Sequence, residues 1–462
     1  MKEYDVIVIG SGAGSIIAEN AIRHDMSVAL IDKGPLGGTC LNVGCIPSKM
    51  LIYPADRIAE ILDSEKLGIK ASIDSIDFMS IMERMRTKVS TSAGHIRKGI
   101  SNVKGLDLYE AVGRFTGEHS LDVDGEKITG DKIFIAAGAR PHIPEGIGFE
   151  NIDYLTNENA LELSELPKSM IVIGGGFISA EYAHFFSAMG TDITIVQRNK
   201  MFLPDEEPEL SDILLKEMRK RMTIFTGTEV VRVERTSDGI RVTGKDRGTS
   251  ETNYYTAEKV LVVTGRKSNA DLLQVAKAGI KTDKRNYIIV DDYLQTNKKR
   301  IWAFGDIIGK QMFRHVANRE ATVAWHNAID TAGHKHKMDY HASPHAVFTY
   351  PEIASVGMKE YEAIAEYGPE GILVGKGYFS EVAMGEAMVD DASMAKAVVS
   401  RSDGKIVGFH VLGPHASILI QEVINAMALG GDIRILGEGM HIHPALSEVI
   451  ISALNNLEEP SV

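Results

Sequence analysis

The chain has 462 residues, which is too many for one compact hydrophobic core and predicts about three domains. Hydrophobic residues make up 44% and charged residues 24%, a globular composition that excludes disorder, collagen and coiled coil. The formal net charge of -13 argues against a nucleic-acid-binding protein, which usually carries a basic face.

Membrane and secretory segments are not predicted. The longest apolar stretches fall far short of the roughly 20 residues that a bilayer-spanning helix needs. The first ten residues run directly into a strand pattern, without the basic region and cleavage site of a secretory signal. We therefore expect a cytoplasmic protein with no membrane partner.

The first element is a strand that enters a glycine-rich turn. Residues 4–10 are a β-branched run typical of a buried parallel strand, and GSGAGS follows before a helical segment and a second strand at 28–31. Such a turn lets the backbone approach a pyrophosphate at the helix N-terminus. Ser15 replaces the third glycine, and Asp32 ends the second strand, where a carboxylate binds ribose hydroxyls. An ordinary strand–turn–helix unit without a ligand is the alternative.

Cys40 and Cys45, in GGTCLNVGCIPSK, are the only cysteines of the chain. A thiol pair this close to a nucleotide site can cycle between dithiol and disulfide, and a helix N-terminus together with Lys49 would favour the thiolate. Two buried thiols, or half of a metal site, are the alternatives. We predict no metal site, because no further cysteine exists and the histidines lack finger spacing.

Residues 48–105 are predicted to be helical, and short strands are predicted at 132–137 and 259–263.

The same strand–turn–helix–strand pattern returns in the middle of the chain. A strand at 170–173 leads into GGGFIS, a helix at 180–189 and a strand at 192–196. Two copies of one unit indicate two doubly wound nucleotide-binding domains.

The second copy differs where it would contact the adenosine ribose. Gln197 stands at the position of the usual carboxylate, and Arg198 follows it, with Lys200 nearby. A carboxylate would repel a 2′-phosphate, whereas a guanidinium pairs with it. This pattern favours NADPH over NADH. A solvated Arg and Lys at a strand end is the alternative.

The last third predicts a mixed α+β domain. Strands are expected at 346–349, 372–379, 395–399 and 406–412, and helices at 416–428 and 444–455. His443 and Glu448 open the last helix, with Pro444 in its first turn. Glu448 could orient His443 and raise its basicity, as in a general acid/base dyad. A capped helix with a surface His and Glu is the alternative.

These motifs, in this order, resemble the class I pyridine nucleotide–disulfide oxidoreductases over essentially the whole chain, and the motif CLNVGCIPSK is highly specific. The resemblance implies an FAD-binding domain at 1–148 and 268–335, an NAD(P)-binding domain at 149–267 and a dimerisation domain at 336–462. It implies that Cys45 lies nearest the flavin, that Cys40 exchanges with the substrate, and that His443 and Glu448 come from the partner subunit of a homodimer.

With the positions already noted, the resemblance implies a set of cofactor-binding residues. They are Gly10, Gly12, Gly14, Ser15, Asp32, Lys33, Gly38, Thr39, Lys49, Ala137, Gly138, Arg140, Gly174, Gly176, Phe177, Ile178, Glu181, Gln197, Arg198, Gly265, Arg266, Gly305, Asp306, His315, Val316 and Ala317.

The motifs favour two different members of this family. CLNVGCIPSK and HIHPALSE are most similar to dihydrolipoyl dehydrogenases, our first hypothesis, with a lipoyl-borne substrate. Gln197 and Arg198 favour the alternative, an NADPH-dependent reductase of a small disulfide such as mycothione or glutathione, with a role in cell redox homeostasis. A mercuric reductase is not expected, because the C-terminal tail has no second cysteine pair. A flavin-bearing binding subunit without disulfide turnover is a third hypothesis, against which the cysteine pair and the His–Glu dyad argue.

Overall fold

The computed structural model describes residues 1–460, which divide into two compact units. The first unit contains residues Met1–Ser48, Met82–His142 and Gly265–Asp339. The second contains Lys49–Ile81, Ile143–Thr264 and the chain from Tyr340 onward. Residues 461 and 462, the end of the predicted third domain, lie outside the described residues. The predicted three-domain division stays a prediction.

A seven-stranded sheet forms the core of the first unit, in the order β3-β2-β1-β6-β5-β4 with β16 also paired to β6. Its strands are β1 (Lys2–Ile9), β2 (Val28–Ile31), β3 (Leu106–Tyr109), β4 (Gly113–Gly117), β5 (Ser120–Val123), β6 (Glu126–Ile135) and β16 (Ile301–Ala303). The pairs among β3, β2, β1, β6 and β16 are parallel, whereas β5 pairs antiparallel with both β4 and β6. Residues 6–8 of β1 are fully buried, which explains their unbroken apolar run.

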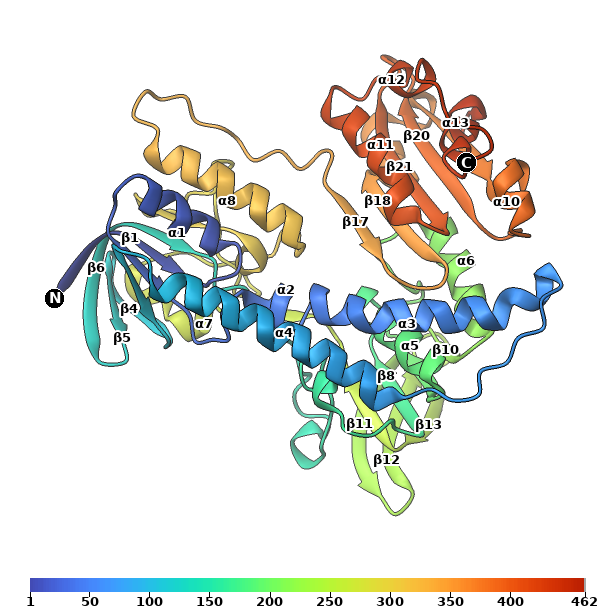
Figure 1. Cartoon of the computed structure of the whole chain (residues 1–462), viewed down its shortest axis with the longest axis horizontal. Coiled ribbons are helices and arrows are strands. Elements are labelled where there is room, and N and C mark those ends of the chain that lie inside the picture. The colour runs from blue at the N-terminus through green and yellow to red at the C-terminus, as the bar shows by residue number, and fades with distance from the viewer. Residues whose placement is uncertain (461–462) are drawn as a thin grey trace. The chain divides into compact units, whose positions relative to one another are not determined.

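Two helices of this unit, α1 (Gly14–Arg23) and α8 (Arg314–Ile329), lie side by side (Figure 1). Their apolar residues join the core cluster that also contains the sheet strands. The short strands β7 (Ala139–Pro141) and β15 (Arg266–Ser268) pair antiparallel, and α2 (Gly38–Asn42) and α7 (Ala270–Leu273) complete the unit.

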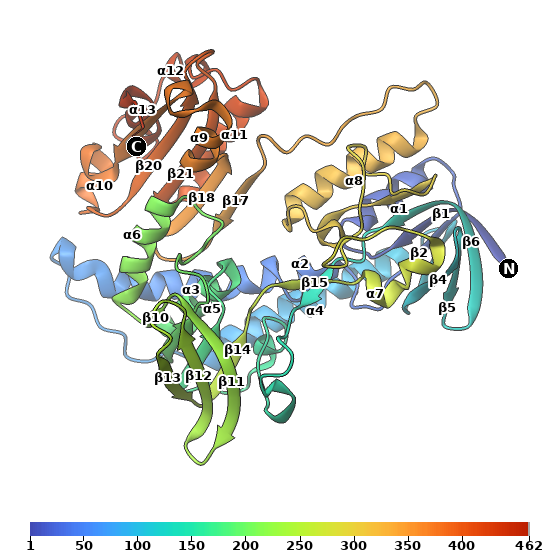
Figure 2. The same ribbon diagram turned by 180° about the vertical axis from the view of Figure 1, so that it is seen from behind.

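The second unit contains a parallel four-stranded sheet in the order β10-β9-β8-β14 and an antiparallel sheet β11-β12-β13 (Figure 2). The strands are β8 (Ser169–Ile173), β9 (Asp192–Val196), β10 (Thr223–Phe225), β11 (Thr228–Thr236), β12 (Gly239–Asp246), β13 (Thr252–Ala257) and β14 (Lys259–Val262). The helices are α5 (Phe177–Met189) and α6 (Pro208–Arg219). β8, α5 and β9 are the second strand–turn–helix–strand copy predicted from the sequence.

The C-terminal part of this unit is a six-stranded antiparallel sheet in the order β17-β18-β21-β20-β19-β22. Its strands are β17 (Pro344–Val347), β18 (Glu352–Gly357), β19 (Ile372–Tyr378), β20 (Met394–Ser400), β21 (Ile406–Gly413) and β22 (Leu457–Glu458). Its helices are α9 (Glu360–Tyr367), α10 (Ala383–Ala387), α11 (Ala416–Ala428), α12 (Arg434–Gly437) and α13 (Glu448–Asn455). α11 packs on β18 and β21. The predicted fold class is therefore confirmed.

The helix predicted over 48–105 was wrong as one continuous element. Two helices, α3 (Cys45–Asp63) and α4 (Phe78–Ser101), are separated by a short turn and a loop. Gly68 adopts a φ of 79°, which ends the first helical segment, and the Asp77 carboxylate caps α4 by accepting a hydrogen bond from the Ser80 amide at 2.9 Å.

The last helix was predicted to begin too early. α13 begins at Glu448 rather than at Pro444, because the residues before it form a turn that the Glu448 carboxylate closes by accepting the Ala445 amide proton at 3.0 Å. Pro444 thus precedes the helix instead of occupying its first turn.

Candidate functional site

The first glycine-rich turn fits tightly against the strand beside it. Gly10 has a φ of 104°, and a methyl group on its Cα would lie 2.3 Å from the carbonyl oxygen of Ala136. A methyl group on Gly14 would lie 2.8 Å from Val8, so Gly14 provides the close helix–strand approach expected of a third glycine. Ser15 donates its hydroxyl proton to the Gly12 carbonyl at 2.8 Å. The amide groups at the start of α1 have no side-chain cap.

Asp32 is held in place at the end of β2. Its two carboxylate oxygens accept the Ser11 amide proton at 2.6 Å and the Gly34 amide proton at 2.8 Å. These bonds fix the carboxylate beside the glycine-rich turn, where a ribose would bind. Lys33 follows as an exposed side chain.

The cysteine segment begins directly against this turn. A methyl group on Gly38, the first residue of α2, would lie 2.7 Å from the Cα of Gly12. The amide of Asn42 holds the segment by donating to the carbonyls of Leu36 at 3.0 Å and Gly38 at 2.9 Å. Thr39, between the glycine and the first cysteine, is half-buried. The first cysteine is thus two residues from a backbone contact with the nucleotide turn.

The turn between α2 and α3 brings the two cysteines together. A methyl group on Gly44 would lie 3.2 Å from the Cα of Cys40, so the backbone just before Cys45 touches the first cysteine. Cys40 is half-buried, whereas Cys45 is exposed at the first residue of α3. The cysteine pair predicted from the sequence is therefore close in space.

The segment that returns from β6 is supported by β15 and α7. Asn269 donates to the Ala137 carbonyl at 2.8 Å, and Gly138 takes a φ of 67°. Arg140 binds both carboxylate oxygens of Asp271, at 2.9 and 2.6 Å. The terminal nitrogens of Arg140 donate to protein acceptors, and its predicted role in cofactor binding stays a prediction. Gly265 is exposed.

A second polar group lies at the start of the Gly305–Ile308 turn. The buried Glu320 carboxylate accepts the Gly305 amide proton at 2.7 Å. Asp306 lies 3.5 Å from Nε of Arg266, which is buried and has no hydrogen-bond acceptor among the described residues. Burial raises the pKa of Asp306, and Arg266 opposes that rise. A ligand with hydroxyl groups would satisfy Asp306, because a carboxylate accepts hydroxyl protons.

The predicted residues at the start of α8 differ in exposure. His315 is exposed and its ring stacks on that of Phe313, with centroids 5.8 Å apart. Val316 and Ala317 are buried. Glu320 and Arg314 on this helix were not identified from the sequence. A charged side chain within the apolar spacing of a helix was the only signal for the buried Glu320.

Lys49 and Glu181, two of the predicted cofactor-binding residues, form an ion pair. Lys49, on α3, donates to both oxygens of Glu181, on α5, at 2.7 and 2.8 Å. Glu181 is 4% exposed and also accepts the Phe348 amide proton at 3.1 Å. The Lys49 ammonium lies 4.3 Å from the centre of the Phe348 ring. The cation and the carboxylate are therefore fixed relative to each other.

The second glycine-rich turn opens toward α5. Gly174 has a φ of 119°, and a methyl group on it would lie 2.4 Å from the Val263 carbonyl oxygen. No atom lies within 4 Å of the methyl position on Gly176, which precedes the first helical residues Phe177 and Ile178. Ser179 replaces the third glycine and donates to the Gly174 carbonyl at 2.8 Å. The amide groups at the start of α5 have no side-chain cap, as a pyrophosphate site requires.

Gln197 and Arg198 directly follow β9, beside this turn. Gln197 is 6% exposed, and a methyl group on Gly175 would lie 2.7 Å from its side-chain amide carbon. Its amide nitrogen donates weakly to the Met201 carbonyl at 3.4 Å. Arg198 is exposed. The strand end thus presents a neutral amide and a guanidinium, without a carboxylate at either position.

His443 and Glu448 form the predicted dyad. Nδ1 of His443 lies 2.8 Å from the Glu448 carboxylate, and the imidazole is 72% exposed. The hydrogen bond from the Ala445 amide, followed by the one from His443, holds the pKa of Glu448 below its usual value. The carboxylate is therefore ionised, and its contact with Nδ1 orients the exposed ring.

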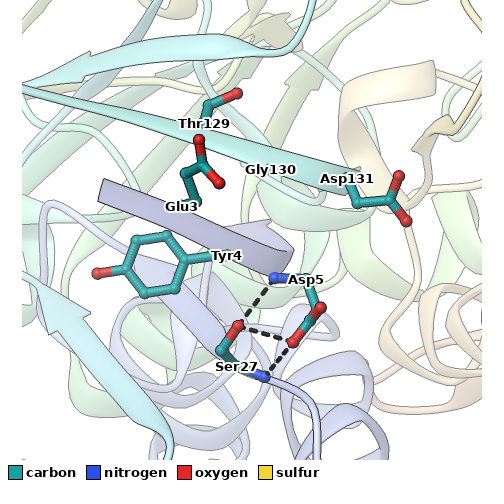
Figure 3. A pocket seen from close by; sticks show the side chains of 7 residues that line it. All are labelled: Glu3, Tyr4, Asp5, Ser27, Thr129, Gly130 and Asp131. Carbon is teal, nitrogen blue, oxygen red and sulfur yellow. Dashed lines mark hydrogen bonds between the residues drawn. The ribbon is translucent and has the colours of Figure 1, made fainter. Parts of the chain in front are cut away.

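A hollow of about 390 Å³ lies elsewhere in the first unit, near the amino end of β1 and the middle of β6 (Figure 3). It is lined by Glu3, Tyr4, Asp5, Ser27, Thr129, Gly130 and Asp131. Asp5 accepts protons from the amide and the hydroxyl of Ser27, at 2.8 and 2.7 Å. None of the predicted site residues lines it, and nucleotides bind at the opposite, carboxyl ends of such strands.

Two negative findings apply to residues 1–460. No helix there combines the length and the apolar character needed to cross a membrane. No group of three or more His, Cys, Asp or Glu side chains is arranged to hold a metal ion in that range.

The comparisons with known proteins agree with this geometry. The family model described as pyridine nucleotide-disulphide oxidoreductase matches residues 4–331, and the dimerisation domain of the same family matches residues 343–454. Mycothione reductase of Mycobacterium tuberculosis is 34% identical over 99% of this chain and 100% of its own length. Dihydrolipoyl dehydrogenase of Chlamydia muridarum is 34% identical over 97% of this chain and 95% of its own.

A solved structure is similar over nearly the whole chain. It is the Cu(II) complex of the HOCl-induced flavoprotein disulfide reductase RclA from Escherichia coli, with 26% identity, 98% of this chain and 99% of that chain covered, and a TM-score of 0.87. The chain is therefore an FAD-dependent flavoprotein. More particularly, it belongs to the pyridine nucleotide–disulfide oxidoreductase family, whose members use NAD(P)H as electron donor and whose dimerisation domain indicates a homodimer.

Proposed function

We propose that this enzyme uses NADPH to reduce a disulfide of low molecular weight. The observation that carries the proposal is the end of β9, where Gln197 is buried against the glycine-rich turn and the exposed Arg198 follows it. No carboxylate there would repel a 2′-phosphate, and the guanidinium can pair with one. The whole-length similarity to a mycothione reductase supports a small disulfide as substrate.

FAD would be held by the residues around the first glycine-rich turn and by Asp306. The uncapped amino end of α1 suits the pyrophosphate, the fixed carboxylate of Asp32 suits the adenosine ribose, and Asp306 suits the hydroxyls of the ribityl chain. When bound, FAD accepts a hydride from NADPH and passes two electrons to a disulfide. These residues fit that cofactor, because amide donors suit the pyrophosphate and carboxylate acceptors suit the hydroxyl groups of the ribose and the ribityl chain.

The two cysteines would carry the disulfide exchange. The Cys40 thiolate attacks one sulfur of the substrate disulfide, which forms a mixed disulfide and releases the first substrate thiol. The Cys45 thiolate then attacks the Cys40 sulfur, which closes the protein disulfide and releases the second thiol. Two electrons from NADPH return this disulfide to the dithiol. The resemblance of CLNVGCIPSK supports the assignment of Cys45 to the flavin side and of Cys40 to the substrate side.

His443 would move the proton that each leaving thiolate needs. Its Nδ1 is bonded to the ionised Glu448, and its Nε2 is available to give a proton to sulfur or to take one from it. Since the family forms homodimers, we assign to each active site the cysteines of one subunit and His443 of the partner subunit.

Dihydrolipoyl dehydrogenase activity is the second candidate. The segments CLNVGCIPSK and HIHPALSE favour it, as does the 34% identity to a dihydrolipoyl dehydrogenase over nearly the whole chain. The reaction would then run in the opposite direction, from a lipoyl dithiol carried by another protein to the nicotinamide.

Steady-state kinetics test the choice between these functions. We expect a higher kcat/KM with NADPH and a small disulfide than with NADH and lipoamide. Arg198→Glu should lower kcat/KM for NADPH by about 10- to 100-fold, from the loss of a phosphate pair worth about 1–3 kcal/mol, and leave that for NADH within about threefold. Arg232→Glu, at an exposed arginine on β11, serves as the control. Preference for NADH by the parent chain would contradict the NADPH assignment.

A further inference from the structure

The first residue of α8 reaches the first nucleotide turn. A methyl group on Gly12 would lie 3.5 Å from Nη1 of Arg314 and 3.8 Å from the Cα of Gly38. The guanidinium is therefore in contact range of the middle glycine of the turn. Both residues belong to the first unit, although about 300 positions separate them in the sequence.

The backbone that carries Arg314 is fixed by the Gly305–Ile308 turn. The Glu320 carboxylate on α8 accepts the Gly305 amide proton, and a methyl group on Gly305 would lie 3.4 Å from the Cβ of Ala317. Glu320 is fully buried and Ala317 is 7% exposed. The start of α8 is therefore locked against the Gly305–Ile308 turn, and only the long side chain of Arg314 extends toward Gly12.

Arg314 differs from the other arginines of this site in having no anionic partner. Arg140 is paired with Asp271 and Arg266 faces Asp306. Within residues 1–460, the half-buried Arg314 has no carboxylate within 4 Å of its guanidinium and no hydrogen-bond acceptor. A cation that is partly removed from water is stabilised by an anion with several acceptor oxygens.

We propose that Arg314 binds the pyrophosphate of FAD. The amide groups at the start of α1 have no side-chain cap and address the same group, so Arg314 adds a full positive charge to their partial charges. The inference rests on the FAD dependence of the family and not on which disulfide the enzyme reduces.

The experiment measures FAD affinity of the full-length holoprotein by equilibrium dialysis at several NaCl concentrations. Arg314→Gln should weaken FAD binding by about 10- to 100-fold, as the loss of one charge-assisted hydrogen bond predicts. Arg314→Lys should recover part of this loss, because it keeps the charge. Arg319→Gln, at an exposed arginine on the same helix, should bind FAD like the parent chain.

Salt dependence separates a charge contact from a change in folding. Raising NaCl should weaken FAD binding more in the parent chain than in Arg314→Gln, because salt screens the missing interaction only where it exists. Equal FAD affinity and equal salt dependence in the two proteins would overturn the inference and leave the proposed function intact. Equal weakening by Arg319→Gln would also overturn it. A parent chain that binds no FAD would instead contradict the proposed function, and this inference with it.

Discussion

At the scale of single residues, two serines replace the third glycine of the nucleotide turns without closing them. Ser15 donates to the Gly12 carbonyl, and Ser179 donates to the Gly174 carbonyl. Each hydroxyl therefore forms a hydrogen bond within its own glycine-rich turn. In the first turn the close contact with the strand passes to the neighbouring Gly14, which lies against Val8. A missing glycine in such a motif is therefore compatible with an intact nucleotide site.

The first prediction concerns Glu448, because its carboxylate orients His443. His443→Gln should lower kcat by about 100- to 10 000-fold, the usual value of general acid–base catalysis, and Glu448→Gln by a smaller factor on the order of 10- to 100-fold. The second His–Glu pair of this segment, His441 with Glu422 at 3.1 Å, offers a matched control. Glu422→Gln should leave kcat within about threefold of the parent; an equal loss would assign both pairs a structural role.

The residues of the site were predictable from the sequence where the backbone dictates them. Gly10 and Gly174 need their left-handed conformations, and Asp32 follows from the length of its strand. Partners that come from distant segments were not predictable. The sequence does not indicate that Arg140 binds Asp271 or that Arg266 faces Asp306. A salt bridge depends on the distance between two side chains in the folded protein.

At the scale of secondary-structure elements, α3 and α5 are joined by two polar contacts. Lys49 binds Glu181, and two helical turns later Asp56 accepts from Nε2 of His184 at 2.9 Å. Arg221 lies 2.9 Å from Nδ1 of His184, and an arginine can only donate, so the ring proton is on Nε2. His184 is fully buried. The charges of Asp56 and Arg221 therefore fix one neutral tautomer of this histidine.

The second prediction follows from that arrangement. Asp56→Ala removes the acceptor of a buried N–H group and should lower the free energy of unfolding by about 1.5–3 kcal/mol. Glu60→Ala, on the same helix but exposed and paired only with Arg57, should change it by less than about 0.5 kcal/mol. Chemical denaturation of the holoprotein measures both. Equal effects would show that Asp56 contributes no more than a surface charge.

The third prediction is a pH dependence. Burial, and then the charge of Arg221, lowers the pKa of His184, while Asp56 opposes the shift. Below roughly pH 6.5 the histidine binds a proton in the unfolded chain but not in the folded chain. The contribution of neutral His184 to the free energy of unfolding is therefore complete above that pH. It is lost as the pH falls toward the lowered pKa of the folded state. His184→Gln should therefore flatten the decline of unfolding free energy between about pH 6.5 and 5. The buried His410, whose pKa is also lowered, keeps the decline from vanishing.

Element boundaries show why the fold was only partly predictable. The β8–α5–β9 copy was evident, because buried parallel strands and helix periodicity leave a strong pattern. The interruption between α3 and α4 depends on the backbone conformation of Gly68 and on the cap by Asp77. Apolar residues at helical spacing on both sides of it suggested one continuous helix. The exposed sheet β11-β12-β13 was missed, because its strands mix charged and polar residues on the open face.

At the scale of the whole molecule, the C-terminal domain exposes large apolar side chains. Ile418 is 68% exposed, Leu429 76% and Ile442 77%, and Met440 is fully exposed. They lie on α11 and between α11 and the His443–Glu448 dyad. Because this part of the sequence matches a dimerisation domain, we expect a second copy of the chain to cover these side chains.

The fourth prediction tests whether the two subunits share each active site. Cys45→Ser and His443→Gln homodimers should each be nearly inactive. A mixed dimer of the two variants has one site with both changes and one site with neither, so it should recover about half of the parent activity per dimer. Differently tagged subunits, refolded together and separated, allow the measurement. A mixed dimer as inactive as its parents would place the cysteines and His443 of each site on one subunit.

The outward-facing imidazole of His443 has a consequence for inheritance. With the shared active sites proposed above, a chain altered at both Cys45 and His443 would inactivate its own centre and also the one that it completes in a normal partner. In a cell producing both kinds of chain in equal amounts, only pairings of two normal chains would keep working centres. Such a double change would therefore behave as a dominant lesion, while either single change would leave every mixed pair one functioning centre.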